Sequence, residues 1–215
     1  MNISRKFPHS RLRRNRFTSS IRNLVAENNL TVNDLIQPIF VKEGLDGSET
    51  INSLPGINRY GLNALDSELE RIQNNKINAV AVFPVIDPKK KDDNGTESLN
   101  EDNLVCKAIK QIKNNSDLTV IADVALDPYT SHGHDGLLNE SGYVDNDKSL
   151  VSRTAQAMTL AKAGADMVAP SDMMDGRIAS IRSSLEENGF VNTIILSYAA
   201  KYSSKFYGPF RDAVG

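Results

Sequence analysis

The chain has 215 residues and a formal charge of −2; 40% of its residues are hydrophobic and 24% are charged. This composition is typical of a globular protein with a sizeable core, and no apolar run approaches the eighteen residues of a membrane helix. Residues 1–20 lack the apolar centre of a secretory signal, and the single cysteine, Cys106, excludes an internal disulfide. We therefore expect a cytoplasmic protein with no membrane partner.

Charge is distributed unevenly along the chain. The first thirty residues contain seven basic side chains and one acid, which leaves 18 basic and 26 acidic side chains in the remainder. Such an arm can bind nucleic acid, act as an organelle-targeting peptide or dock on an acidic body. Because the remainder is acidic and has no basic face interleaved with aromatics, we expect docking and no nucleic-acid partner. We divide the chain into a basic arm, residues 1–30, and a body, residues 31–215. The basic residues of the arm are Arg5, Lys6, Arg11, Arg13, Arg14, Arg16 and Arg22.

Hydrophobic periodicity predicts that strands and helices alternate in the body. A short helix is expected at Thr18–Glu27, and Leu35–Val41 is expected to be a strand that Pro38 distorts. The segment Gly44–Gly61 is rich in turn-forming residues and is predicted to be a connection. The further elements expected are a helix at Leu62–Asn75, a strand at Asn78–Val85, a helix around Cys106, a strand at Leu118–Leu126, a helix at Lys148–Ala163, a strand at Ala165–Pro170, a helix at Asp175–Gly189 and a strand at Thr193–Ala200.

The predicted strands are nearly continuous apolar runs, as expected for a parallel sheet that is covered on both faces. A doubly wound dinucleotide-binding sheet would carry G-x-G-x-x-G after its first strand, and this chain has no such motif. Polar residues instead follow successive strands, at Asp123 and Asp127, at Ser171 and Asp172, and at Lys201. This arrangement favours an α/β fold of the (β/α)8 TIM barrel type, whose site lies at the carboxyl ends of the strands. Because about five strands are present, the predicted barrel is incomplete.

Three stretches contain residues that can carry chemistry. The loop Asp123–Gly136 is dense in acids and imidazoles; it is either a site for a hard cation such as Mg²⁺, with Zn²⁺ admitted by two histidines, or a polar loop whose side chains cap turns. Ser171 and Asp172 can orient a substrate or relay protons, or an aspartate of this stretch can cap a helix. Lys201, just past a predicted strand, can attack a ketone if it is desolvated, and Lys205 is its rival.

Long motifs of the chain resemble one family of enzymes. The chain is similar to porphobilinogen synthase (5-aminolevulinate dehydratase) of tetrapyrrole (heme) biosynthesis, with the motifs in family order over nearly its whole length. The resemblance implies a lyase with a barrel fold that condenses two molecules of 5-aminolevulinate to porphobilinogen with loss of water. The motifs are RLRRN from Arg11, LIQPIFV from Leu35, LPGI from Leu54, DVALDPYTSHGHDG from Asp123, APSDMMDGR from Ala169 and SYAAKYSSKFYGPFRDA from Ser197.

The resemblance also implies roles for individual residues. Lys201 matches the Schiff-base lysine of the family, whose iminium acts as an electron sink that makes the adjacent carbon acidic. Arg211 matches an arginine that holds a substrate carboxylate. The other matches are two substrate-binding pocket walls, Tyr207 and Phe210, and three catalytic residues, Asp123, Ser171 and Asp172.

The acidic loop differs from that of the zinc-dependent branch of the family, which carries three cysteines at the positions of Ala125, Asp127 and Asp135. This chain has no thiol there, so the catalytic zinc site of the three-cysteine type is lost. The chain resembles the aspartate-rich branch, which is associated with Mg²⁺ or with monovalent cations, and Asp127 and Asp135 are the candidate metal ligands. His132 and His134 occur in both branches, which weakens them as ligands.

Several family features fall beyond the last residue of this chain: a second Schiff-base lysine, further carboxylate-binding residues and an allosteric magnesium glutamate. We therefore expect an amino-terminal portion of the enzyme that is inactive alone. The basic arm matches a family segment that wraps a neighbouring subunit, usually within a homo-octamer. Two alternatives stay open, a Schiff-base aldolase that shares the barrel and the lysine, and a non-catalytic remnant that joins full-length subunits.

Overall fold

The chain divides into two compact units. The computed structural model describes residues 6–215, so Arg5 of the basic arm lies outside the described residues. One unit ends at Asp34, and the other spans Leu35–Gly215. All of the strands among the described residues belong to the second unit.

The first unit consists of short helices. It contains two 3-10 helices, η1 (Leu12–Arg16) and η2 (Val32–Asp34), and the α-helix α1 (Ser19–Leu24). The predicted helix of this region is present but shorter, and Thr18 caps it by accepting a hydrogen bond from the N–H of Ile21. No residue of these three helices is buried. The helices therefore gain little hydrophobic stabilisation from one another.

The second unit is built on one open sheet. Its strand order is β2-β3-β1-β4-β5-β6-β7, and every pairing is parallel except that of β2 with β3. β1, β4, β5, β6 and β7 are neighbours in chain order, as the strands of a (β/α)8 barrel are, and among the described residues the sheet does not close. The bounds are β1 Ile36–Lys42, β2 Ser48–Thr50, β3 Asn58–Tyr60, β4 Ala79–Val85, β5 Thr119–Val124, β6 Met167–Pro170 and β7 Ile194–Ile195.

The hairpin of β2 and β3 lies where the sequence predicts only a connection, so that prediction was wrong. Each strand has three residues, too few for an alternation of polar and apolar residues to be recognised. β3 pairs with β1 at Phe40 and Val41 only, which leaves Pro38 outside this pairing. β1 continues through Pro38 as one strand, because proline is tolerated where no ladder hydrogen bond is required of its nitrogen.

The last strand is much shorter than predicted. β7 pairs with β6 only through Ile194 and Ile195, whereas the apolar run predicts a strand to residue 200. The ladder proceeds as far as the N–H of Leu196, which donates to the carbonyl of Val168 at 3.0 Å. The next donor on the β6 side would be the nitrogen of Pro170, and proline has no N–H. Residues 197–200 therefore leave the sheet.

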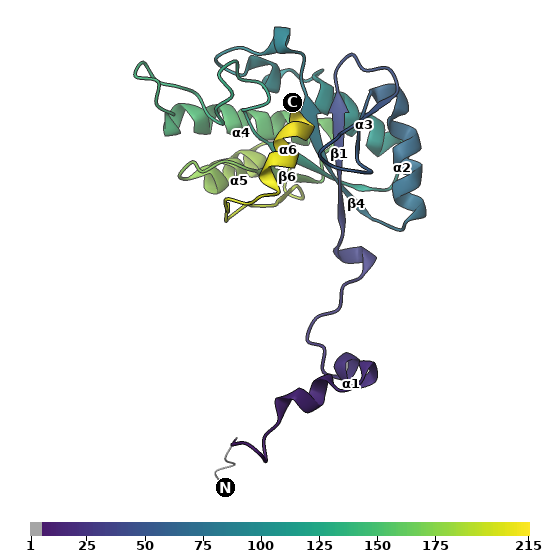
Figure 1. The fold of residues 1–215 in the computed structure, drawn as a ribbon. Helices are drawn as coiled ribbons and strands as arrows, with labels where there is room; N and C mark the ends of the chain where they lie inside the picture. The colour runs from purple at the N-terminus through teal and green to yellow at the C-terminus, as the bar shows by residue number, and fades with distance from the viewer. Residues whose placement is uncertain (1–5) are drawn as a thin grey trace. The chain divides into compact units, whose positions relative to one another are not determined.

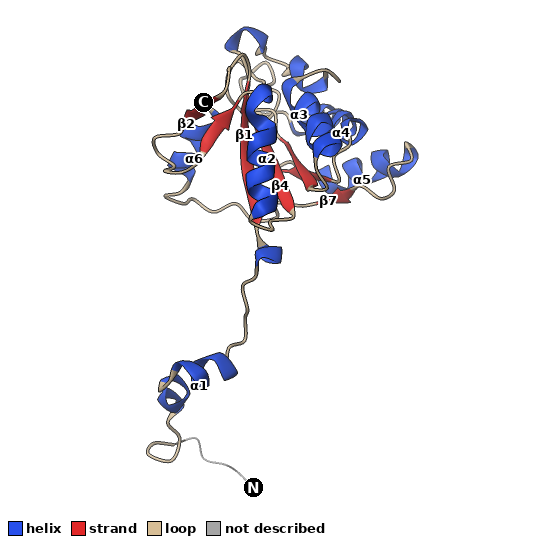
Figure 2. Ribbon diagram, turned by 90° about the vertical axis from the view of Figure 1, so that its right-hand side faces the viewer, coloured by secondary structure: helices blue, strands red, loops and turns tan. Residues whose placement is uncertain are grey.

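Apolar side chains form two clusters, one on each face of the sheet. The larger cluster lies against the helices α2 to α5 and includes Val80 and Val82 of β4. The smaller contains Phe40 of β1 and Ala213 of α6, with Phe83 of β4 against it. Since alternate strand residues point to opposite faces, α3 and α6 lie on opposite sides of β1 (Figure 2). The C-terminus, at the end of the yellow helix α6, lies near β1 (Figure 1). The helix bounds are α2 Leu65–Asn74, α3 Leu104–Asn115, α4 Asn146–Ala163, α5 Arg177–Glu187 and α6 Tyr207–Val214.

The predicted helices of the second unit are confirmed to within a few residues, and α6 is an additional one. Asn103 caps α3 by accepting a hydrogen bond from the N–H of Cys106 at 2.8 Å. Gly164, in the left-handed region with φ of 106°, ends α4. Cys106 is buried, and burial raises the pKa of its thiol to about 11, as expected for a packed helix residue. None of the helices that the structure describes combines the length and apolar character needed to span a bilayer.

Candidate active site

A cavity of about 610 Å³ lies at the carboxyl ends of the parallel strands. Its walls come from β4, from the ends of β5 and β6, from the segment after β7 and from α6. It brings together seven of the nine residues that the sequence singles out, from parts of the chain up to 87 residues apart. These seven are Asp123, Asp127, Asp135, Ser171, Lys201, Tyr207 and Phe210.

Two predicted residues do not line this cavity. The carboxylate of Asp172 is fully buried, and Asp172 borders an adjoining hollow that also reaches Asp135 and Lys201. Arg211 is exposed on α6, and no ion pair to its guanidinium is formed within residues 6–215. Its charge is therefore free for an incoming anion.

The acidic side of the cavity is set by the end of β5 and the loop after it. Asp123 is the fifth residue of β5, and its Oδ1 atom is buried without a hydrogen-bond partner among the described residues. Burial, reinforced by the carboxylates of Asp135 and Asp127, raises the pKa of Asp123 to about 8. Burial and the charge of Asp135 likewise raise the pKa of Asp127 to about 6. At neutral pH, Asp123 is therefore largely protonated and can give up a proton.

Arg153 organises the base of this acidic side, and sequence reasoning missed it. Its guanidinium is completely buried; Nη1 donates to the carbonyl of Val124 at 2.8 Å and lies 2.8 Å from Oδ2 of Asp172. Nη2 donates to the carbonyl of Asp135 at 2.8 Å and also pairs with the carboxylate of Asp135. One cation thus ties together the end of β5, the loop after it and the loop after β6.

A signal for Arg153 was present in the sequence. Within α4, the buried positions Ser149, Arg153, Ala157 and Leu160 follow helical spacing on one face. A charged residue on such a face is rarely buried unless it has a partner of opposite charge. The position of Arg153 therefore indicates a buried ion pair, although it does not indicate the partner.

Lys201 faces the acids from the opposite side of the cavity. Its Nζ lies 3.9 Å from Oδ2 of Asp135, and its side chain is 44% exposed. The desolvation expected for this lysine is therefore absent from the structure, because the short β7 releases the chain before residue 201. Lys201 borders the cavity, whereas its rival Lys205 is exposed and does not.

The α6 helix closes the cavity with two aromatic residues. The ring of Phe210 packs edge-on against Phe83, with centroids 5.1 Å apart, and against Phe40 at 5.9 Å. Tyr207 lies at the rim and is 60% exposed. Phe210 is thus held by the sheet, whereas Tyr207 remains accessible to a ligand.

Among the described residues, the acids of the cavity are not arranged as a set of metal ligands. Within residues 6–215, no three His, Cys, Asp or Glu side chains are grouped so that they could hold one. Oδ1 of Asp135 already accepts from the N–H of Leu126 and from Arg153, and its Oδ2 faces Lys201. Asp127 and Asp135 as metal ligands therefore stay a prediction that this arrangement does not support.

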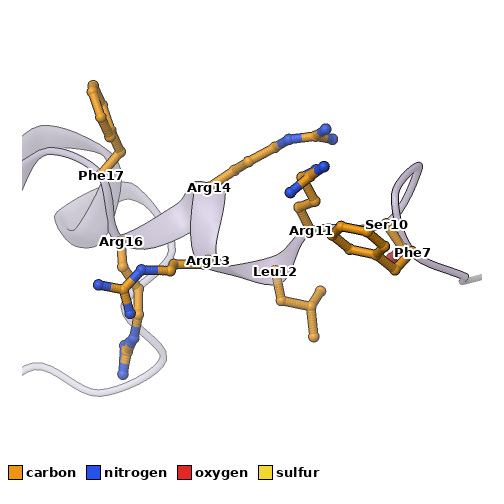
Figure 3. A pocket seen from close by; sticks show the side chains of 8 residues that line it. All are labelled: Phe7, Ser10, Arg11, Leu12, Arg13, Arg14, Arg16 and Phe17. Carbon is orange, nitrogen blue, oxygen red and sulfur yellow. The ribbon is translucent and has the colours of Figure 1, made fainter.

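The basic arm has a hollow of its own, of about 670 Å³. In the view of Figure 3, the side chains of Arg13 and Arg16 extend to one side and those of Arg11 and Arg14 to the other, with the guanidinium of Arg11 beside the ring of Phe7. The Cζ atom of Arg11 lies 4.2 Å from the centre of that ring, at the distance of a cation–π contact. None of the described residues that line the hollow is acidic, so the positive charge of its arginines is not compensated by a carboxylate of the lining.

Comparison with known proteins finds one family. A family model described as delta-aminolevulinic acid dehydratase matches residues 9–215. The delta-aminolevulinic acid dehydratase of Bradyrhizobium diazoefficiens is 47% identical over 206 residues, which are 95% of this chain and 58% of the relative. That of Chlamydia pneumoniae is 49% identical over 205 residues, 95% of this chain and 61% of the relative. This chain thus spans about three fifths of the length of these relatives.

A solved structure agrees with both the family and the fold. The crystal structure of delta-aminolevulinic acid dehydratase (porphobilinogen synthase) from Toxoplasma gondii ME49, in complex with the reaction product porphobilinogen, is 45% identical and superposes with a TM-score of 0.90. The match covers 95% of this chain and 58% of that one. The open parallel sheet is therefore part of a TIM barrel, as the sequence predicts.

Proposed function

Since the chain belongs to the delta-aminolevulinic acid dehydratase family, we propose that it contributes the Lys201 side of a site that condenses two molecules of 5-aminolevulinate to porphobilinogen. The observation that carries the proposal is the shared cavity, in which one accessible lysine faces Asp123, Asp127 and Asp135. A nucleophilic amine opposite a protonated carboxyl group suits the formation and use of a Schiff base.

In the proposed first steps, Nζ of Lys201 attacks the keto carbon of 5-aminolevulinate. The carbinolamine loses its hydroxyl group as water after protonation, and an iminium remains. Asp123 is the proton donor for this loss, because its raised pKa of about 8 keeps it protonated at neutral pH. The iminium then withdraws electrons from the adjacent carbon, which can lose a proton and attack the second substrate molecule.

Ser171 and Asp172 take different parts in this proposal. Ser171 borders the cavity, so its hydroxyl group can contact the substrate or relay a proton. Asp172 is paired with buried Arg153, and we assign it a positioning role through that arginine. Arg211 supplies a cation for the substrate carboxylate, while Tyr207 and Phe210 form part of the wall of the cavity that Lys201 also lines.

Assembly, location and cation are further parts of the proposal. The arm presents exposed apolar residues, among them Leu12, Phe17 and Leu24, next to uncompensated arginines. These features suit an arm that binds a second, acidic copy of this protein, within a homo-octamer.

A cytoplasmic location suits the free thiol of Cys106. Mg²⁺ or a monovalent cation stays a prediction, and no step above passes through a metal ion.

Covalent trapping tests the proposal without requiring a full turnover. Sodium borohydride added with 5-aminolevulinate should reduce the iminium to a stable amine, which peptide mass spectrometry locates. We expect the adduct on Lys201, its loss in Lys201→Met and its retention in Lys205→Met, a matched lysine four residues away. An adduct confined to other lysines would exclude the role of Lys201. The family assignment removes the support for a Schiff-base aldolase.

A further inference from the structure

The C-terminal turn of α6 is held by a residue from a distant part of the chain. Nε of Arg59, on β3, donates to the carbonyl of Ala213 at 2.8 Å, and its Nη2 donates to the carbonyl of Asp212. These carbonyls belong to the end of a helix, where no amide of the helix remains to pair with them. A cation there also interacts favourably with the negative end of the helix dipole.

An ion pair with Glu49 fixes the position of Arg59. Its Nη1 lies 2.9 Å from Oε1 of Glu49 on β2, and Nζ of Lys42 on β1 lies 2.7 Å from the same oxygen. The Arg59 side chain is 16% exposed. The Lys42 and Glu49 side chains are about one-third exposed, so solvent screens their pair only in part. The guanidinium therefore has a carboxylate on one side and helix carbonyls on the other, which fixes its direction.

A second hydrogen bond joins the same two regions. Oγ of Ser53, in the turn between β2 and β3, donates to Oδ2 of Asp212 at 2.5 Å. Ala213 is completely buried in the small apolar cluster that also contains Phe40. One side of α6 is thus fastened to the β2–β3 hairpin and to β1.

The opposite side of α6 is exposed and carries the two residues that the proposed function assigns to the substrate carboxylate. Tyr207 and Arg211 are four residues apart and so share one side of the helix, away from Ala213. Both are exposed. Because α6 has only eight residues, it is too short to persist by its own hydrogen bonds and depends on tertiary contacts. The positions of Tyr207 and Arg211 therefore depend on how firmly the other side is fastened.

We propose that Arg59, fixed by Glu49 and assisted by Ser53, is a positioning residue of the substrate site: it holds α6 so that Arg211 and Tyr207 meet the substrate carboxylate. The role of these two residues rests on the proposed function, whereas the anchoring of α6 does not. Arg59 lies outside the cavity and acts on the substrate only through the helix. Loss of the anchor should weaken ligand capture and leave the chemistry at Lys201 unchanged.

Amide hydrogen exchange of the full chain tests the anchor. In Arg59→Ala we expect exchange in residues 208–215 to rise roughly tenfold, because two hydrogen bonds to the last turn are lost. Arg59→Lys, which can keep one of them, should give a smaller rise. Arg71→Ala is the matched control, since Arg71 pairs with Glu68 on α2 and does not touch α6. Exchange in α3 should be the same in all of these proteins.

An unchanged exchange rate of residues 208–215 in Arg59→Ala, or an equal rise in Arg71→Ala, would overturn the anchor. If Arg59→Ala raises exchange in α3 as well, the variant has lost its fold. The milder variant Ser53→Ala then tests whether contacts from the β2–β3 hairpin anchor α6. Removal of the Ser53 hydroxyl should raise exchange in residues 208–215 by roughly threefold and leave α3 unchanged. No rise in α6 would again overturn the proposal.

Borohydride trapping separates a positioning role from a merely structural one. In Arg59→Ala the concentration of 5-aminolevulinate that half-saturates trapping at Lys201 should rise roughly five- to tenfold, while trapping at saturation stays at the parent level. Arg59→Lys should restore much of the affinity. A lower plateau with an unchanged half-saturating concentration would refute positioning. If the parent chain forms no adduct at Lys201, the proposed function fails, and the exchange of α6 still decides the anchor.

Discussion

The two sides of the cavity are built in different ways. The acidic side, with Asp123 and Arg153, lies at the end of a strand that is paired on both edges and is buried in the core. The side with Lys201 follows the two-residue strand β7 and is largely exposed. The chain packs against the sheet again at α6. Groups on the acidic side therefore depend on the stability of the whole unit, whereas Lys201 and Arg211 depend on a few local attachments.

This difference has a chemical consequence. A buried wall can shift the pKa of a carboxyl group far from its ordinary value, as it does for Asp123, because little water is left to solvate the charge. The exposed surroundings of Lys201 instead leave room for a substrate to reach its amine. In the proposed function, proton donation thus belongs to the rigid side and substrate capture to the accessible side.

The largest effect is expected from Arg153→Met, which breaks the acidic side. The change leaves Asp172 and Asp135 without their buried counter-ion, and breaking such a pair costs about 3–5 kcal/mol. The free energy of unfolding, measured by urea denaturation at pH 7, should fall by this amount. Lys162→Met, which removes the exposed partner of an exposed carboxylate, Glu101, should cost less than about 1 kcal/mol. Equal losses in the two variants would show that Arg153 has no special part in the acidic side.

An intermediate effect that depends on pH is expected from Asp123→Asn. The folded chain keeps the proton of Asp123 up to a pH of about 8, whereas the unfolded chain releases it near pH 4. The folded state therefore binds more protons between these values, and stability declines as the pH rises through this window. Asparagine does not ionise, so the variant should be more stable than the parent by about 3 kcal/mol at pH 6, and the difference should widen further up to pH 8.

The same variant should exceed the parent by less than about 1 kcal/mol at pH 4, because the folded chain holds the proton of Asp123 there and the unfolded chain has released it in only about half of the molecules. Asp127, with a pKa raised to about 6, adds its own decline between pH 4 and pH 6 in both proteins. Thermal unfolding of the parent and of the variant at pH 4, 6 and 8 measures the difference. A gap that does not widen with pH would mean that Asp123 ionises in the folded chain as freely as in water.

The smallest effect on stability is expected from Lys201→Met on the other side of the cavity. The pair with Asp135 spans 3.9 Å and its lysine is 44% exposed, so its loss should change the free energy of unfolding by less than about 0.5 kcal/mol. Urea denaturation at pH 7 measures this, with Lys205→Met as the control for removing an exposed lysine of the same segment. A loss of several kcal/mol would place Lys201 in the core of the unit and remove the contrast between the two sides.

Much of the fold could be predicted because it depends on local patterns. Continuous apolar runs identify β4 and β5, helical spacing identifies α3, and Gly164 marks the end of α4. The hairpin of β2 and β3 and the helix α6 were missed, because short elements carry too few residues for a period to be recognised. The shortness of β7 was missed for another reason: it depends on Pro170 of a neighbouring strand, not on the apolar run itself.

The candidate site divides in the same way. The sequence by itself determined that acids follow β5, that Ser171 follows β6 and that one lysine follows the last strand, because these are positions along the chain. Only the tertiary structure decided that Arg153 lies beneath Asp135 and Asp172, and that Arg59 holds the end of α6. The physical reason is that such pairs join residues 18 to 154 positions apart, and no local periodicity or propensity encodes which distant group a buried charge will meet.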